Sequence, residues 1–256
     1  MWRLLLAFSI LFTSTSFAGS DVDDVVKKNI SQINNFAAES ILDFLGGPGA
    51  TEVEVKGLEN KKPEYSIMMV RPFSLSTEHS FFSQIQLNHY YIRNDGRVAI
   101  NLGLGYRKIF NDNYILGINL FLDVDDEDNT RSSLGLEIKS NAFEAYANYY
   151  SSISSSTKVG VNTERVLDGY DIHALGQVPF LPWAKIHYTY FDWEADKLST
   201  DTDGSELSLE MLITKNIMLE VGYSDDNFTS AEGFGSITFV YPRSNGTSAL
   251  DEIIRE

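Results

Sequence analysis

Hydrophobic and polar residues alternate with a period of two through most of the chain after residue 50. In the stretch RVAINLGLGYR, Arg97 to Arg107, the even positions are apolar or aromatic and the odd positions are small, polar or charged. Side chains of a β-strand point alternately to the two faces of its sheet. The stretch therefore predicts a strand with one wholly apolar face. The same alternation recurs in about twelve segments between Thr51 and Tyr241, which predicts an all-β domain of that many strands.

Turn chemistry predicts that these strands form an antiparallel, closed barrel in a membrane. Short links such as KSNA and TKN alternate with long polar ones such as VDDEDNT and SSISSSTKVGVNTERVLD. Outer-membrane barrels have short periplasmic turns and longer extracellular loops. The six prolines are expected at strand ends or turns. A soluble β-sandwich or a lipocalin-like barrel would alternate as well, but the number of strands, the aromatic-flanked apolar faces and the aromatic end of the last strand favour a transmembrane barrel.

The phase of the alternation assigns residues to the two faces of this barrel. Charges stay out of phase with the apolar positions, since a lipid-facing charge at the bilayer midplane costs about 2–4 kcal/mol. The residues predicted to face the lumen are Arg97, Asn101, Arg107, Glu137, Lys139, Asp171, His173, Lys185, His187, Glu206, Glu210 and Glu220. The residues predicted to face lipid are Val98, Ile100, Leu102, Leu104, Tyr106, Leu116, Ile118, Leu120, Ile237, Phe239 and Tyr241.

The ends of the chain predict export and two short flanking segments. Residues 1–18 carry one early positive charge, an apolar run and small residues before a cleavage point, which is typical of a signal peptide rather than of a membrane anchor. Residues 19–50 predict a periplasmic helical segment, because apolar residues recur every three or four positions from Asp21 to Leu45 and GGPG follows. The barrel is predicted over residues 51–241.

Residues 242–256 form the predicted C-terminal tail. Ser248 and Asp251 fit a capping box at the start of a helix that contains Ile253 and Ile254. The tail could be the remnant of a lumen plug or a frayed terminus. If it is helical, its rise of about 1.5 Å per residue is too small to cross the membrane. Ile253 and Ile254 are therefore expected to stay in the lumen or the periplasm.

Composition and charge exclude several functions. The formal net charge is −16, so the chain has no electrostatic basis for general nucleic-acid binding. It has no cysteine, which excludes disulfides and thiolate metal sites. The mean hydropathy of −0.16 is compatible with a transmembrane barrel, in which only every second strand residue meets lipid. No cofactor is expected.

Two stretches of the sequence contain residues that could form a catalytic site or a metal site. His173 and His187 lie on neighbouring predicted strands, and a hairpin at PFLP would bring them close together with Asp171 nearby. No nucleophile accompanies them, so we expect ordinary polar lumen residues and not an enzyme. Asp123 to Asn129 contains five acids but lacks the spacing and the turn glycine of a calcium loop. A solvated loop, which divalent ions could bridge to lipopolysaccharide, is expected there.

Three segments, taken together, resemble the β-domain of inverse autotransporters, the intimin and invasin family. They are NLGLGYRKIFNDNYILGINLFLDVD, RSSLGLEIK and DGYDIHALGQVPFLPWAKIHYTYF, and the likeness extends roughly from Asn34 to Tyr241. The resemblance implies a twelve-stranded barrel in the outer membrane of a Gram-negative bacterium. It also implies that the barrel anchors and helps to export an adhesin-like passenger. Outer-membrane lipids, lipopolysaccharide, the barrel assembly machinery and periplasmic chaperones are the implied partners.

The sequence departs from the family pattern after Tyr241, where fifteen residues follow in place of a run of extracellular domains. A passenger is therefore expected to have been lost or to be encoded separately. The alternative is a small passive-diffusion pore or a structural outer-membrane protein on the same scaffold. Small residues predicted in the lumen favour an opening: Gly103, Gly105, Gly117 and Gly135.

Overall fold

The computed structural model describes residues 49–57, 62–76, 78–92, 95–110, 113–159, 162–195 and 200–242, together with residues 246, 248 and 249. The described residues all belong to one compact unit of the chain, Leu45–Glu256. The predicted signal peptide and the helix predicted from Asp21 to Leu45 lie outside the described residues. In the tail, Ser248 is buried and Ala249 is helical, whereas Asp251, Ile253 and Ile254 are not among the described positions. No helix in the described part of the chain is long and apolar enough to cross a membrane.

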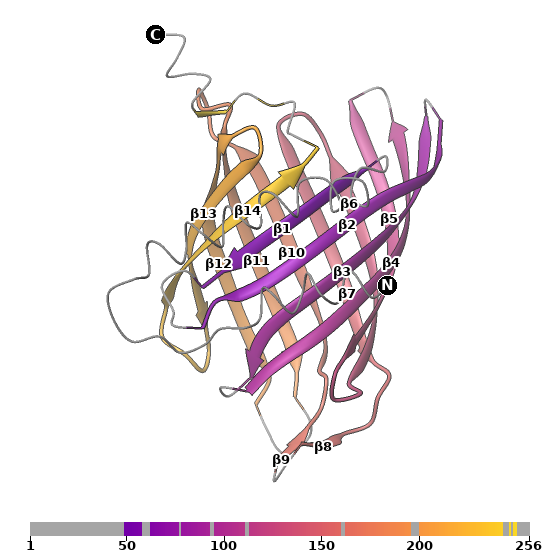
Figure 1. Ribbon diagram of the computed structural model, residues 1–256, viewed down its shortest axis with the longest axis vertical. Helices are drawn as coiled ribbons and strands as arrows, with labels where there is room; N and C mark the ends of the chain where they lie inside the picture. The colour runs from indigo at the N-terminus through magenta and orange to yellow at the C-terminus, as the bar shows by residue number, and fades with distance from the viewer. Residues whose placement is uncertain are drawn as a thin grey trace, which may run out of the picture. The chain divides into compact units, whose positions relative to one another are not determined.

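Twelve antiparallel strands close into a barrel, which confirms the predicted fold (Figure 1). Neighbours in sequence pair from β1 to β7, β7 pairs with β10, pairing continues to β14, and β14 pairs with β1. The strands are β1 Ala50–Lys56, β2 Glu64–Leu75, β3 His79–Ile92, β4 Asp95–Phe110, β5 Tyr114–Asp125, β6 Thr130–Lys139, β7 Phe143–Ser152, β10 Asp168–Gln177, β11 Ala184–Glu194, β12 Thr202–Thr214, β13 Ile217–Asp226 and β14 Glu232–Tyr241. The short strands β8 Thr157–Val159 and β9 Asn162–Glu164 form a separate hairpin between β7 and β10.

The register matches apolar with apolar and polar with polar across the strands. Leu102 of β4 pairs with Ile85 of β3 and with Leu122 of β5, all on the outer face. The next residue, Gly103, pairs with Gln84 and Phe121 on the inner face. Exposure alternates residue by residue along β5 for the same reason.

The interior of the barrel is polar and its exterior is apolar. Among the described residues, the buried hydrophobic side chains are Phe82, Ala184 and Leu212. Charged and polar side chains take the place of an apolar core; Arg97, Glu137 and Asp171 are each less than 10% exposed. A single sheet closed on itself can bury only one face, so this distribution leaves the apolar face for a nonaqueous surrounding.

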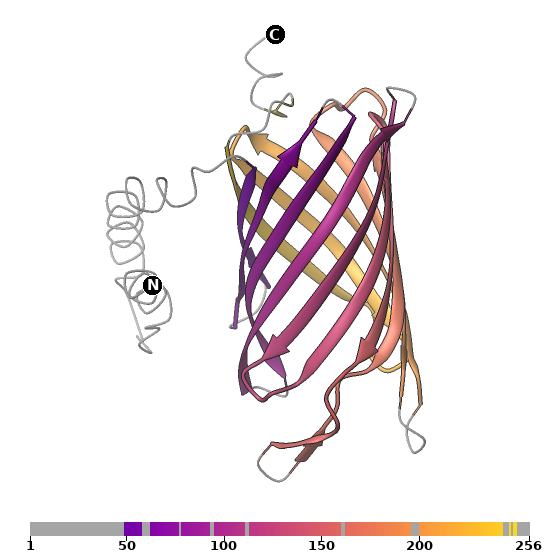
Figure 2. The same ribbon diagram turned by 90° about the vertical axis from the view of Figure 1, so that its right-hand side faces the viewer.

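The connections separate onto two rims (Figures 1 and 2). The short-turn rim carries the links 76–78, 111–113, 140–142, 178–183 and 215–216, and both β1 and β14 have their outer ends there. The long-loop rim carries the links 57–63, 93–94, 126–129, 153–167, 195–201 and 227–231. The β8–β9 hairpin projects from the long-loop rim (Figure 2). The links that the sequence analysis named as short and long fall on these two rims as predicted, although the link 93–94 on the long-loop rim has only two residues and the link 178–183 on the short-turn rim has six.

Two details differ from the sequence-based prediction. Pro72 lies inside β2 and not at a strand end, at a register shift opposite β3. β1 begins at Ala50 opposite Val70, so it offers no partner to Pro72, and a residue without an N–H is tolerated at this interrupted ladder. The predicted acidic loop is also shorter than expected, because Asp123 and Asp125 belong to β5.

Candidate functional site: the polar lumen

All twelve residues predicted to face the lumen lie on the inner faces of β4, β6, β10, β11, β12 and β13. Five charged side chains form a continuous chain of ion pairs near the short-turn rim. Arg107 pairs with Glu137, and the Lys139 ammonium lies 3.6 Å from Glu137 and 3.4 Å from Glu144. The Lys185 ammonium reaches across β10 to Glu144 at 2.9 Å. These contacts neutralise the basic residues and cross-link four strands from the inside.

Asp171 is the centre of a second network. Its carboxylate accepts hydrogen bonds from Asn148 Nδ2 and from the Tyr150 hydroxyl, both at 2.7 Å. His173 Nε2 lies 3.1 Å from the same carboxylate, and His173 Nδ1 is 2.8 Å from Thr189 Oγ1. Three side chains thus hold a buried carboxylate in place, and Thr189 holds the third of them, His173.

The two histidines are not directly opposite each other. His173 pairs with Thr189, while His187 pairs with Leu175 and lies 3.4 Å from Glu210. The row Asp171, His173 and Thr189 has the acid–imidazole–hydroxyl order of a hydrolase. Thr189, however, is paired on both sides in the closed sheet, so its neighbouring N–H groups are used by the ladder and cannot stabilise an oxyanion.

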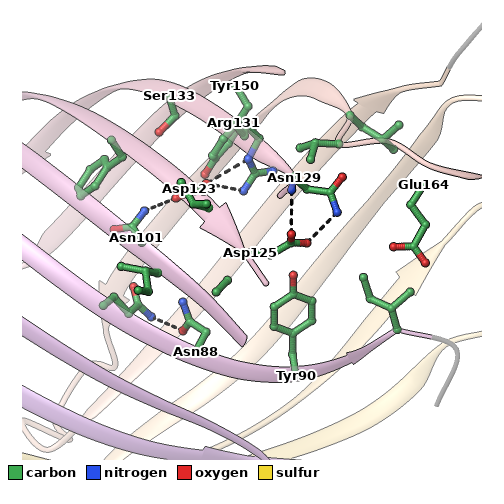
Figure 3. A pocket seen from close by; sticks show the side chains of 18 of the residues that line it. Asn88, Tyr90, Asn101, Asp123, Asp125, Asn129, Arg131, Ser133, Tyr150 and Glu164 are labelled. Atoms are coloured by element: carbon green, nitrogen blue, oxygen red, sulfur yellow. Dashed lines mark hydrogen bonds and ion pairs between the residues drawn. The ribbon is translucent and has the colours of Figure 1, made fainter. Parts of the chain in front are cut away.

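A vestibule of about 1030 Å³ opens in the lumen toward the long-loop rim (Figure 3). In it, Asn101 donates a hydrogen bond to Asp123, and Arg131 donates two to the same carboxylate, at 2.9 and 3.1 Å. The Arg131 guanidinium stacks 4.2 Å from the centre of the Tyr150 ring. The remaining wall is rich in amides, including Gln84, Gln86, Asn88 and Asn148.

Arg97 ties two loops to the vestibule wall. Its side chain is 3% exposed and makes ion pairs of 2.9 Å with Glu127 and with Glu164. Glu127 lies in the β5–β6 link and Glu164 in β9, so one buried guanidinium connects the hairpin and the neighbouring loop to β4. A buried arginine of this kind is retained only because both partners neutralise it.

The acidic stretch is organised by internal hydrogen bonds. The Asp125 carboxylate accepts from the backbone N–H groups of Glu127 and Asn129 at 2.9 Å and from Asn129 Nδ2 at 2.8 Å. Asp123 is engaged by Arg131, and Glu127 by Arg97. No group of three or more His, Cys, Asp or Glu residues within the described ranges is arranged to hold a metal ion.

The lumen glycines do not leave open space, contrary to the prediction. A Cβ on Gly103 would lie 1.9 Å from the Phe121 ring, and one on Gly105 would lie 2.1 Å from the Phe82 ring. At Gly117 the corresponding space is filled by the Glu137 side chain. At Gly135 it is filled by the side chains of Asn119 and Asn148. Glycine at these positions lets large side chains of the neighbouring strands pack against the wall.

A second cavity, of about 200 Å³, lies against a different part of the wall. Residues of β1 and of β10 to β14 line it, and it shares no lining residue with the vestibule. His173, His187, Glu206 and Glu220 face it. Glu210 contacts His187 beside it.

The residues predicted to face lipid lie on the outer face. Nine of the eleven are among the exposed large hydrophobics, with exposures from 36% at Val98 to 61% at Leu104 and Leu120; Tyr106 and Tyr241 are half-buried. The Tyr106 ring lies 4.8 Å from Phe81, close to the short-turn rim. Near the long-loop rim, outward Tyr170 and Tyr190 lie 6.1 Å apart. Such aromatic belts at both ends of an apolar band are typical of membrane barrels.

Sequence reasoning missed several inward-facing residues that hold these networks together: Asp123, Arg131, Glu144 and Tyr150. Each lies in the polar phase of its strand, so extending the alternation to the strand ends would have found them. Their partners could not have been found in this way, because pairing depends on register.

A closed antiparallel barrel with a polar interior and an apolar exterior flanked by aromatic residues defines a transmembrane β-barrel protein. The family model "Inverse autotransporter, beta-domain" matches residues 11–244, and the chain belongs to this family. It is therefore an outer-membrane barrel of a Gram-negative bacterium.

One curated relative and two solved structures are also similar to the chain, and the solved structures agree with the barrel fold. The chain is 26% identical over 167 residues to a "Putative attaching and effacing protein homolog" of Escherichia coli K12, covering 63% of this chain and 55% of the relative. It thus spans about half the length of that relative. Among solved structures, a chain from work on the in-meso crystallization of membrane proteins matches with TM-score 0.68 and 24% identity over 79% of this chain and 86% of that one. The COG4313 outer membrane channel of Pseudomonas putida F1 matches with TM-score 0.53 and 10% identity, covering 75% and 93%.

Proposed function

We propose that this barrel anchors an adhesin-like passenger in the outer membrane and provides the route by which a polypeptide reaches the cell surface. The observation that carries the proposal is the position of the two ends of the sheet. β1 begins and β14 ends at the short-turn rim. We assign this rim to the periplasm, because short turns are periplasmic in outer-membrane barrels. A segment after Tyr241 can then reach the outside only through the lumen.

The lumen is suited to an extended chain passing through it. Its wall is polar, its charges are mostly paired with one another, and the vestibule of about 1030 Å³ opens at the long-loop end. The closed hydrogen-bond ladder provides no free strand edge. Amide side chains such as Gln84 and Asn88 can serve both N–H and C=O groups of a passing backbone. We further propose that the barrel has no enzymatic role, and that lipopolysaccharide, the barrel assembly machinery and periplasmic chaperones are its partners.

Site-specific crosslinking tests the route, because the chain has no native cysteine. A passenger reporter with single cysteines in its linker is fused after Glu256, and a second cysteine is placed by Asn101→Cys on the inner face. Leu102→Cys, one residue away on the outer face, is the matched control. We expect surface-labelled reporter and a crosslink to position 101 alone. Surface exposure without that crosslink, or equal crosslinking at position 102, would contradict the lumenal route.

The second candidate function is a passive-diffusion pore, which the volume of the vestibule favours. Planar-bilayer conductance distinguishes the two. A barrel that is silent and conducts after deletion of residues 242–256 supports a plugged translocator. Steady conductance by the intact chain supports a pore.

A further inference from the structure

We propose that the smaller lumen cavity binds an organic cation of the ammonium or guanidinium class. The cavity measures about 200 Å³ and is walled by β1 and by β10 to β14. Three carboxylates face it, from Glu54, Glu206 and Glu220, against one ammonium, from Lys56. This proposal does not depend on whether the barrel exports a polypeptide.

The charges around the cavity are not balanced. Lys56 lies over the Phe234 ring at 4.8 Å, and no ion pair among the described residues joins it to the three carboxylates. Glu206 accepts a hydrogen bond from the Ser224 hydroxyl at 3.1 Å, and Glu220 accepts one from Ser208. Three carboxylates therefore face one ammonium in the wall of this cavity, beside the imidazoles of His173 and His187. Enclosed charges of one sign are retained when a counter-charge accompanies them.

A buried hydroxyl in the same wall also lacks a partner. Ser236 is 1% exposed, and its Oγ has no hydrogen-bond partner within the described part of the chain. It pairs with Lys56 on β1 and with Glu220 on β13, so it lies between opposite charges of the cavity wall. Buried hydroxyls in native proteins are almost always hydrogen-bonded. A ligand with several N–H donors would serve Ser236 and the carboxylates together.

The chemistry of the wall favours an organic cation over a metal ion. Calcium and magnesium require several oxygens at about 2.0–2.6 Å from one point. No group of three potential ligands with that arrangement occurs among the described residues. An ammonium or guanidinium group instead donates charge-assisted hydrogen bonds to carboxylates on separate strands.

Titration of the refolded full-length chain with methylguanidinium chloride at pH 8, followed by NMR, tests the site. Urea, a neutral ligand of nearly the same shape, is the control ligand. We expect saturable binding of methylguanidinium and none of urea. Each of the variants Glu54→Gln and Glu220→Gln should weaken binding by about tenfold or more, since each removes one charge-assisted hydrogen bond. The matched control Glu232→Gln, at the exposed long-loop end of β14, should bind as the parent chain does.

Three results would overturn the proposal. They are no binding of methylguanidinium, binding no tighter than that of urea, and binding that neither Glu54→Gln nor Glu220→Gln weakens. Heat-modifiable migration on a gel verifies that each variant is folded. If Glu54→Gln or Glu220→Gln does not fold, the variant Glu206→Gln is tested in its place. A peptide Gly-Ser-Arg-Ser-Gly and its citrulline counterpart distinguish the source of the cation. Tighter binding of the arginine peptide than of methylguanidinium indicates a side chain of a polypeptide in the lumen. Binding of methylguanidinium alone indicates a free cation, and either result supports the site.

Discussion

The lipid-facing assignment predicts that the cost of an outward arginine depends on its depth in the membrane. Leu120 of β5 is 61% exposed and lies six positions from Tyr114, on the same face. At about 3.4 Å per residue and a strand tilt of roughly 40°, the two residues are about 16 Å apart along the barrel axis. If Tyr114 marks the edge of an apolar band about 25 Å tall, Leu120 lies within about 4 Å of the midplane.

Leu120→Arg is therefore expected to destabilise the folded barrel by about 2–4 kcal/mol in a bilayer. Leu116→Arg is the matched control, because Leu116 is 44% exposed on the same strand and face but lies only two positions from Tyr114. Its cost should be about 0–1 kcal/mol. Reversible denaturant unfolding from phospholipid vesicles measures both. In water, an exposed leucine-to-arginine change would usually cost within about 0.5 kcal/mol. Equal effects at the two positions, or a cost below that value at Leu120, would refute a lipid-facing surface.

Three further predictions concern the lumen and the rims. Gly105→Val should destabilise the barrel by about 1–3 kcal/mol in the same unfolding assay, since the Phe82 ring occupies the space of its side chain; an unchanged midpoint would contradict this packing. Asp171→Ala should cost at least about 1–3 kcal/mol, because it leaves three polar partners unpaired. An epitope inserted at Ser155 should be labelled on intact cells and one at Asn141 only after permeabilisation; the reverse pattern would invert the assigned orientation.

The sequence alone determined the class of fold and the two faces of the barrel. The period of two is a local property of the strand, so Leu102 and Asn101 could be assigned to opposite faces without knowledge of their neighbours. Link lengths were enough to predict an antiparallel order and two unlike rims. Where the pattern weakened, at the strand ends, the assignments were less complete, and Asp123 was placed in a loop.

The contacts between residues were decided by the tertiary structure. Register determines that His173 meets Thr189 and not His187, because a shift of two positions keeps every side chain on its face and changes every partner. Barrel closure brings β14 against β1 and places Ser236 beside Lys56, which are 180 positions apart in the chain. Whether a lumen glycine leaves open space also depends on the neighbouring strand, because the Phe121 ring of the next strand fills the space beside Gly103. Alternation is set residue by residue, whereas register and packing are set only when the whole sheet has closed.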